Sequence, residues 1–284
     1  MDNNLIAKIK MYSEEELKDI SKQCYEDDRA YPENFSNWYP HIRSFGKFNH
    51  SKIIATQIFT FEETEFLHKE DDINKVDWNR VTEILRPTLD RLKPHIIYSI
   101  KNGAFSNKFD FSTCMTSKEE LAKNLWKINY YSTMYDSGGY TELGVREILP
   151  YCLDVDNPTI YNGMPLREEI RVFYNMKTKK IEYAVDYWDY DYCRDNLRSI
   201  SDGIVFDWFH NIYGTRKIKH SKKVKELITR IDSMIGGLKF DGKLDGIWSI
   251  DFLWVKETDD IYLIDMARGF RSAYWNAKKC SDVL

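Results

Sequence analysis

The C-terminal stretch of residues 246–275 constrains the fold more than any other part of the sequence. It contains two runs rich in β-branched and aromatic residues, 247–255 and 261–266, on either side of a polar break at residues 256–260. Such runs are typical of strands, and a short polar break between them is typical of a hairpin loop. The stretch therefore predicts an antiparallel hairpin.

Two acidic residues of this hairpin are expected to face each other. We expect Lys256 to pair with Asp260 across a three-residue loop, which places Asp251 directly opposite Asp265. Opposed like charges destabilise a strand pair unless the strand ends separate or a cation lies between them. Mg²⁺, with nucleotide phosphates completing its shell, would make the pair favourable. The alternative is an exposed hairpin face with two solvated acids.

Length and composition limit the class of protein. The 284 residues suffice for a large core and for one large or two moderate domains. The net charge of −4 argues against general binding to nucleic acid or to anionic membranes. The sequence has no apolar run of about 18 residues and no signal peptide, so we expect a cytoplasmic protein with no membrane partner. The 5 scattered cysteines are expected to be reduced thiols.

Two lysines flank a short loop near residue 100. Residues 95–101 and 108–113 are predicted strands, and the loop between them contains glycine and Ser106. Lys101 and Lys108 lie at its two ends. A loop with free backbone N–H groups and two ammonium ions suits a polyphosphate, whereas lysines at strand ends can also be simply solvated.

The rest of the chain is predicted to mix helices with antiparallel strands, as in an α+β fold. We expect helices over residues 13–28, 61–69, 78–92, 116–128 and 194–212 and from Ser221 onward, and strands over residues 51–59, 143–151, 166–174 and 180–188. Residues 130–140 contain two glycines and are expected to form the hinge between two lobes.

Two charged segments of the C-terminal half have two interpretations each. Alternation in residues 166–174 places Arg167, Glu169 and Arg171 on one face, which either forms a surface ladder or lines a cleft suited to phosphates or a carboxylate. The basic cluster from Arg216 to Lys225 is either a solvated helix face, which we favour, or a docking patch for RNA or an acidic partner.

The order of these parts resembles the ATP-grasp fold, and most closely the cell division cycle protein 123 family together with related ATP-grasp ligases of phages and bacteria. The residues that carry the resemblance are Trp38-Tyr39-Pro40, Ser51 to Ile54, Lys101 to Lys108, Val145-Arg146-Glu147, Glu169 to Phe173, Ile250-Asp251 and Leu263-Ile264-Asp265. The resemblance implies two α+β lobes whose antiparallel sheets enclose a nucleotide cleft. It divides the chain into an N-terminal region (1–92), a small lobe (93–140) and a large, metal-binding lobe (141–284).

The resemblance also implies roles for individual residues. ATP would lie between the lobes, and Mg²⁺ would be held by Asp251 and Asp265. The remaining predicted site residues are, for adenine, Glu147, Ile148 and Leu149; for the phosphates, Lys101, Ser106 and Lys108; and for the cleft wall near the phosphates or the acceptor, Arg146, Glu169 and the catalytic Arg171.

Position 267 departs from the pattern of the family, which has an asparagine there that reaches the metal. Ala267 cannot ligate a metal ion. Either water fills the shell, or Arg268 or Arg271 neutralises charge in a catalytic role, or the metal site and catalysis are weakened. The two arginines could instead recognise an anionic acceptor.

Functions of three classes are consistent with these residues. The first is an ATP-dependent ligase that converts a carboxylate to an acyl-phosphate, which an amine or similar nucleophile then captures. The second is a nucleotide-dependent assembly factor of the cell division cycle protein 123 type, which docks a protein partner without obligatory catalysis. The third is an α+β protein with no nucleotide site. The sequence does not identify the acceptor or the partner.

Overall fold

Two β-sheets with helices packed against them form the body of the protein, so the predicted α+β class is confirmed. The computed structural model describes residues 12–42, 49–149, 159–160, 164–165, 167–189, 222–235 and 244–275. Within these residues, no helix combines the length and the apolar character needed to cross a membrane.

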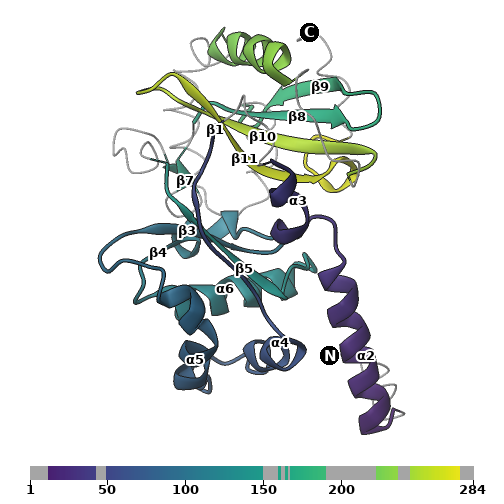
Figure 1. Ribbon diagram of the computed structural model, residues 1–284, viewed down its shortest axis with the longest axis vertical. Coiled ribbons are helices and arrows are strands. Elements are labelled where there is room, and N and C mark those ends of the chain that lie inside the picture. Colours follow the sequence, from purple (N-terminus) through teal and green to yellow (C-terminus); the bar gives the residue numbers. More distant parts are fainter. Residues whose placement is uncertain are drawn as a thin grey trace.

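The first sheet has five strands and lies at the top of Figure 1. Its order is β1 (Asn49–His50), β11 (Asp260–Arg268), β10 (Ile247–Val255), β8 (Glu169–Asn175) and β9 (Lys180–Asp186). All neighbouring strands are antiparallel except β1 and β11, which are parallel. A helix over residues 222–235 buries its apolar stripe in the core of this sheet. The two predicted hairpins, 247–266 and 169–186, are therefore both confirmed and lie side by side.

The register of β10 and β11 confirms the expected pairing of Asp251 with Asp265, although the loop is longer than expected. Val255, and not Lys256, pairs with Asp260, so the loop contains one more residue. A β-bulge between the pairs of Asp251 and Phe252 compensates for this shift. Bulges of this kind bend a strand and redirect its side chains. The two carboxylates lie opposite each other because these two irregularities cancel.

The second sheet has four antiparallel strands. Its order is β2 (Ile53–Ile58), β5 (Glu142–Glu147), β3 (Tyr98–Asn102) and β4 (Met115–Thr116). Three helices lie beneath this sheet in Figure 1, namely α4 (Phe61–Leu67), α5 (Trp78–Leu89) and α6 (Leu121–Met134). Their apolar faces share one core with β2, β3 and β5. The domain boundaries remain a prediction, and this sheet takes strands from all three predicted segments.

Two predictions about the connections around α6 are wrong. Residues 108–113 are not a strand but part of the 3₁₀-helix η1 (Lys108–Cys114). Local hydrogen bonds explain the difference, because the Asp110 carboxylate accepts one from the Ser112 hydroxyl and the Asp110 carbonyl accepts one from Thr113. The expected hinge at residues 130–140 is helical as far as Met134.

Two helices that precede β1, a two-stranded sheet and a short 3₁₀-helix complete the described elements. The helix α2 (Glu14–Arg29) begins with a Ser13–Glu16 capping box and extends away from both sheets in Figure 1. The helix α3 (Phe35–Ile42) lies against the five-stranded sheet. Strands β6 (Thr159–Ile160) and β7 (Met164–Pro165) pair with each other, and the 3₁₀-helix η3 (Gly269–Arg271) follows β11. The predicted helix at residues 194–212 lies outside the described residues.

Candidate functional site

A pocket between the two sheets gathers most of the predicted site residues. It contains about 810 Å³ of space, including its open mouth. The predicted residues that line it are Ser106, Arg146, Glu147, Ile148, Leu149, Glu169, Asp251 and Asp265. They come from β3 and β5 and the segments that follow them on one side, and from β8, β10 and β11 on the other. Side chains more than 100 positions apart in the sequence thus meet in one place.

Apolar side chains make up much of the pocket lining. Leu149 belongs to a small buried cluster with Leu253 and Val255 of β10. The other apolar lining residues are Ile100, Phe111, Met115, Ile148, Met164 and Ile264. Apolar walls with a few convergent polar groups are the usual surroundings of a planar organic ligand.

The paired acids also line the pocket, and Asp251 forms a buried ion pair with Arg171. The guanidinium Nε and Nη2 donate to the two carboxylate oxygens at 2.7 and 2.8 Å. The side chains are 8% and 2% exposed. Burial opposes the charge on Arg171, but Asp251, together with Tyr187 and Glu169, outweighs this effect, so the pKa of the guanidinium is raised. The ring of Tyr187 lies 4.5 Å from the guanidinium carbon and supports it from one side.

Asp265 is paired with the predicted phosphate lysine. The ammonium of Lys101 donates to Oδ1 of Asp265 at 2.8 Å, and the lysine side chain is only 2% exposed. The aspartate is 25% exposed and faces the pocket. Lys101 reaches across from β3 of the four-stranded sheet, so this ion pair joins the two sheets. Arg146 of β5 makes a second connection by donating to the backbone carbonyl of Ile264.

Glu169 lines the pocket from β8. Its carboxylate accepts a hydrogen bond from the Trp188 indole at 3.0 Å, and the residue is buried. Arg167, two positions earlier, also lines the pocket and is buried. The alternating face predicted for this strand therefore lies against the pocket, and the surface-ladder alternative is excluded for these two residues.

The remaining predicted residues lie apart from the pocket lining. The guanidinium Nη2 of Arg268 lies 3.4 Å from Oδ1 of Asp245, and the guanidinium carbon of Arg271 lies 4.7 Å from the centre of the Tyr31 ring. Neither arginine lines the pocket, and their catalytic roles stay predictions. Lys108 begins η1, and the described residues do not include the position of its side chain.

The acids fit a magnesium ion that arrives with a nucleotide better than they fit a free ion. No three His, Cys, Asp or Glu side chains among the described residues gather into a group that could hold a metal. The chain thus offers the two opposed carboxylates of Asp251 and Asp265, each already paired with a cation. Mg²⁺ is commonly held by one or two carboxylates together with phosphate oxygens and water. The donor set suits that arrangement and would not compete well for the bare ion.

Sequence analysis missed several residues of the site. Ser51 and Cys114 line the pocket, and Glu33 is buried with its carboxylate on the backbone N–H of Arg268, at the end of β11. Burial raises the pKa of Glu33, and the nearby Lys101 charge opposes that shift. No local sequence pattern marks Glu33, because it lies in the short connection between α2 and α3. Only the tertiary structure brings it to Arg268.

Of the known proteins compared with this chain, solved structures match it, whereas family models and curated proteins do not. No protein-family model matches the chain, and no curated protein matches it. Its structural neighbours include Cdc123 from Schizosaccharomyces pombe, with 15% sequence identity and a TM-score of 0.46 over 88% of this chain and 90% of that chain. A C-terminally truncated Cdc123 from the same organism has 15% identity and a TM-score of 0.44 over 88% of each chain.

Proposed function

We propose that the pocket binds ATP with Mg²⁺ and that the chain is an ATP-dependent ligase of the ATP-grasp type. The observation that carries the proposal is the meeting of charges from two sheets in one pocket. Asp251 and Asp265 of the five-stranded sheet face Lys101 and Arg146 of the four-stranded sheet. Apolar lining residues beside these charges match a ligand with an apolar base and a polyphosphate.

Each group of the chain has a task in this proposal. The apolar lining residues would hold the base, and Lys101 and Arg146 would neutralise phosphate charge. Mg²⁺, which Asp251 and Asp265 would hold, would supply positive charge that stabilises the negative charge developing on phosphoryl transfer. Arg171 would fix the Asp251 carboxylate through its two hydrogen bonds. Glu169 and Arg167 form the wall beside which a carboxylate acceptor would be aligned for attack on the transferred phosphoryl group.

A second candidate is a nucleotide-dependent assembly factor that binds ATP without obligatory turnover. Ala267 favours it, because this residue offers no ligand where β11 passes the acids. The engagement of Arg268 with Asp245 favours it too, since that arginine lies apart from the pocket lining. Bound nucleotide would then stabilise a shape that a protein partner recognises.

We expect Mg·ATP, but not Mg²⁺ alone, to stabilise the protein against thermal unfolding. Saturation at a hundred times the dissociation constant gives about 2.7 kcal/mol of stabilisation. Asp265→Asn should lose most of the shift relative to its own ligand-free midpoint, because it replaces one of the two opposed carboxylates by a neutral amide, which binds Mg²⁺ more weakly. Asp259→Asn, on the exposed loop of the same hairpin, should keep it. Differential scanning fluorimetry at matched ionic strength measures the unfolding midpoints of the wild type and both variants, each without ligand, with Mg²⁺ alone and with Mg·ATP.

Two outcomes would contradict the predicted stabilisation by Mg·ATP. Equal shifts with Mg·ATP in both variants would place the nucleotide elsewhere, and no shift in the wild-type protein would remove the nucleotide site. Release of ADP or AMP on addition of candidate carboxylates and amines identifies the ligase. Retention of intact ATP together with a bound protein identifies the assembly factor.

A further inference from the structure

The segment that follows η3 packs beside Arg171. We call residues 272–275 the clasp. The Ala273 carbonyl accepts a hydrogen bond from Nη1 of Arg171 at 3.3 Å. Asp251 accepts from Nε and Nη2 of the same guanidinium, and the two residues are direct partners in the pairing of β10 with β8. Each guanidinium nitrogen of Arg171 therefore has an acceptor, and the clasp supplies the one that the ion pair does not.

The flat side of the guanidinium is covered by a residue that the clasp also holds. The Tyr187 ring lies 4.5 Å from the guanidinium carbon of Arg171. The Tyr187 carbonyl accepts a hydrogen bond from the Tyr274 hydroxyl at 2.7 Å. Tyr274 is also the neighbour of Ala273 in the chain. One side chain of the clasp thus fixes the backbone from which the covering ring projects, and its own backbone carries the acceptor on the edge.

Tyr274 has a backbone conformation that few residues with a side chain adopt. Its φ is 70°, in the left-handed region, and the residue is 6% exposed. The Cβ atom makes that region unfavourable for residues other than glycine. Surrounding contacts keep the conformation: the Tyr183 hydroxyl donates to the carbonyls of Tyr274 and Trp275 at 3.2 and 3.0 Å, and the Tyr274 side chain packs with Phe173 and Val185. A costly conformation held in this way beside a candidate site points to a functional role.

We propose that Tyr274 is a positioning residue of the pocket: it fixes the Arg171 guanidinium, which in turn sets the direction of the Asp251 carboxylate. Two parallel N–H groups bind that carboxylate, so a tilt of the guanidinium also tilts both of its oxygens. Groups that orient a metal ligand from behind in this manner control how well it binds. That Asp251 would bind Mg²⁺ rests on the proposed function, whereas the contacts of Tyr274 do not.

Tyr274→Phe removes the hydrogen bond to Tyr187 and keeps the ring. The readout is the ¹H–¹⁵N NMR signal of the Arg171 Nε–H, recorded without nucleotide and assigned by its absence in Arg171→Lys. We expect this signal to be displaced in Tyr274→Phe, and its proton to exchange with water on the order of threefold faster or more, because the guanidinium opens more often. A hydroxyl with only a structural role would lower the unfolding midpoint without changing this signal.

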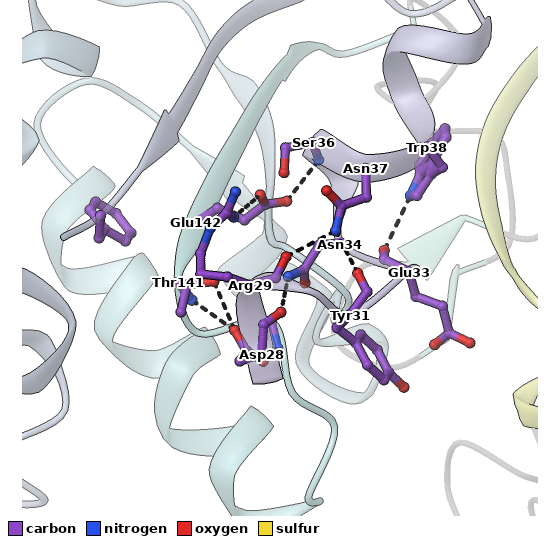
Figure 2. A network of polar contacts seen from close by, with 12 residues as sticks. Asp28, Arg29, Tyr31, Glu33, Asn34, Ser36, Asn37, Trp38, Thr141 and Glu142 are labelled. Atoms are coloured by element: carbon purple, nitrogen blue, oxygen red, sulfur yellow. Dashed lines mark hydrogen bonds and ion pairs between the residues drawn. The ribbon is translucent and has the colours of Figure 1, made fainter. Parts of the chain in front are cut away.

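Tyr25→Phe is the matched control. The Tyr25 hydroxyl donates to the Phe59 carbonyl at 2.8 Å, so this variant loses a bond of the same kind. Its helix α2 remains attached through the Asp28 carboxylate, which accepts a hydrogen bond from the Thr141 hydroxyl at 2.8 Å (Figure 2). These contacts lie beside the four-stranded sheet, whereas Arg171 belongs to the five-stranded sheet. The control should lower the unfolding midpoint and leave the Arg171 signal unchanged.

Binding of Mg·ATP tests the second half of the inference. Isothermal titration calorimetry should give a dissociation constant roughly threefold higher or more in Tyr274→Phe and an unchanged one in Tyr25→Phe. An unchanged Arg171 signal in Tyr274→Phe, equal changes of that signal in both variants, or an unchanged dissociation constant in Tyr274→Phe would each overturn the positioning role. If the wild-type protein does not bind Mg·ATP, the proposed function fails, while the Arg171 signal still decides whether Tyr274 fixes the guanidinium.

Discussion

Asp251→Ala is expected to lower the free energy of unfolding by about 3–5 kcal/mol, the usual cost of leaving one member of a buried ion pair without its partner. Arg171 is 8% exposed and directs two nitrogens at this carboxylate. The truncation leaves the guanidinium in a site that water hardly reaches. Urea unfolding followed by circular dichroism measures the loss.

Two controls locate the cause of this effect. Asp259→Ala, which removes an exposed partner of Arg230 on the same hairpin, should change stability far less. The double variant Arg171→Met, Asp251→Leu should recover most of the loss, since apolar side chains of similar volume often replace a buried ion pair without cost. A loss in Asp251→Ala no greater than in Asp259→Ala would show that solvent or another residue satisfies Arg171.

Acid should destabilise the protein through His68. Burial is the main cause that lowers the pKa of this imidazole from 6.5 to about 4, against the opposing effects of Asp28 and the Tyr140 backbone. The unfolded chain binds the proton near its ordinary pKa, whereas the folded chain resists it. Stability from this group is complete above the unfolded pKa and falls as pH drops toward about 4, by roughly 3 kcal/mol in total.

The pH dependence of His68→Gln tests this assignment. The buried Nε2 of His68 has no hydrogen-bond partner, so the variant removes the titrating group without breaking a bond at that atom. Unfolding free energies of both proteins are compared at steps between pH 7.5 and 4.5. The unfolding free energy of the variant should fall less steeply with decreasing pH than that of the wild type, whatever its value at neutral pH. Parallel curves would mean that other groups cause the acid sensitivity.

The sequence predicted well those features that depend on local alternation. The hairpin of β10 and β11 and the helix with the stripe from Val224 to Ile235 follow from residue period alone. Asp251 and Asp265 were placed opposite each other correctly, but the count of loop residues was short by one. A β-bulge has no strong sequence signature. The pairing was predicted correctly because the missing loop residue and the missed bulge shift the register in opposite directions.

Features that depend on specific side-chain hydrogen bonds or on tertiary contacts escaped prediction. The segment from Lys108 to Cys114 alternates like a strand, yet side-chain hydrogen bonds around Asp110 stabilise a 3₁₀-helix. The strand β5 belongs to the same sheet as β3, a pairing that periodicity does not encode. Glu33, between α2 and α3, accepts the backbone N–H of Arg268, and no spacing rule connects two residues so far apart in the sequence.

The burial of Phe35 and Trp38 of α3 in the core of the five-stranded sheet also affects how the protein folds during its synthesis. Phe35 and Trp38 are synthesised more than 200 residues before Trp248 and Met266, with which they share a core. Their complete burial waits until those later residues are made, because contacts so distant in sequence form late. Translation that stops before β10 would release a chain with an unburied aromatic cluster, which is a substrate for quality control.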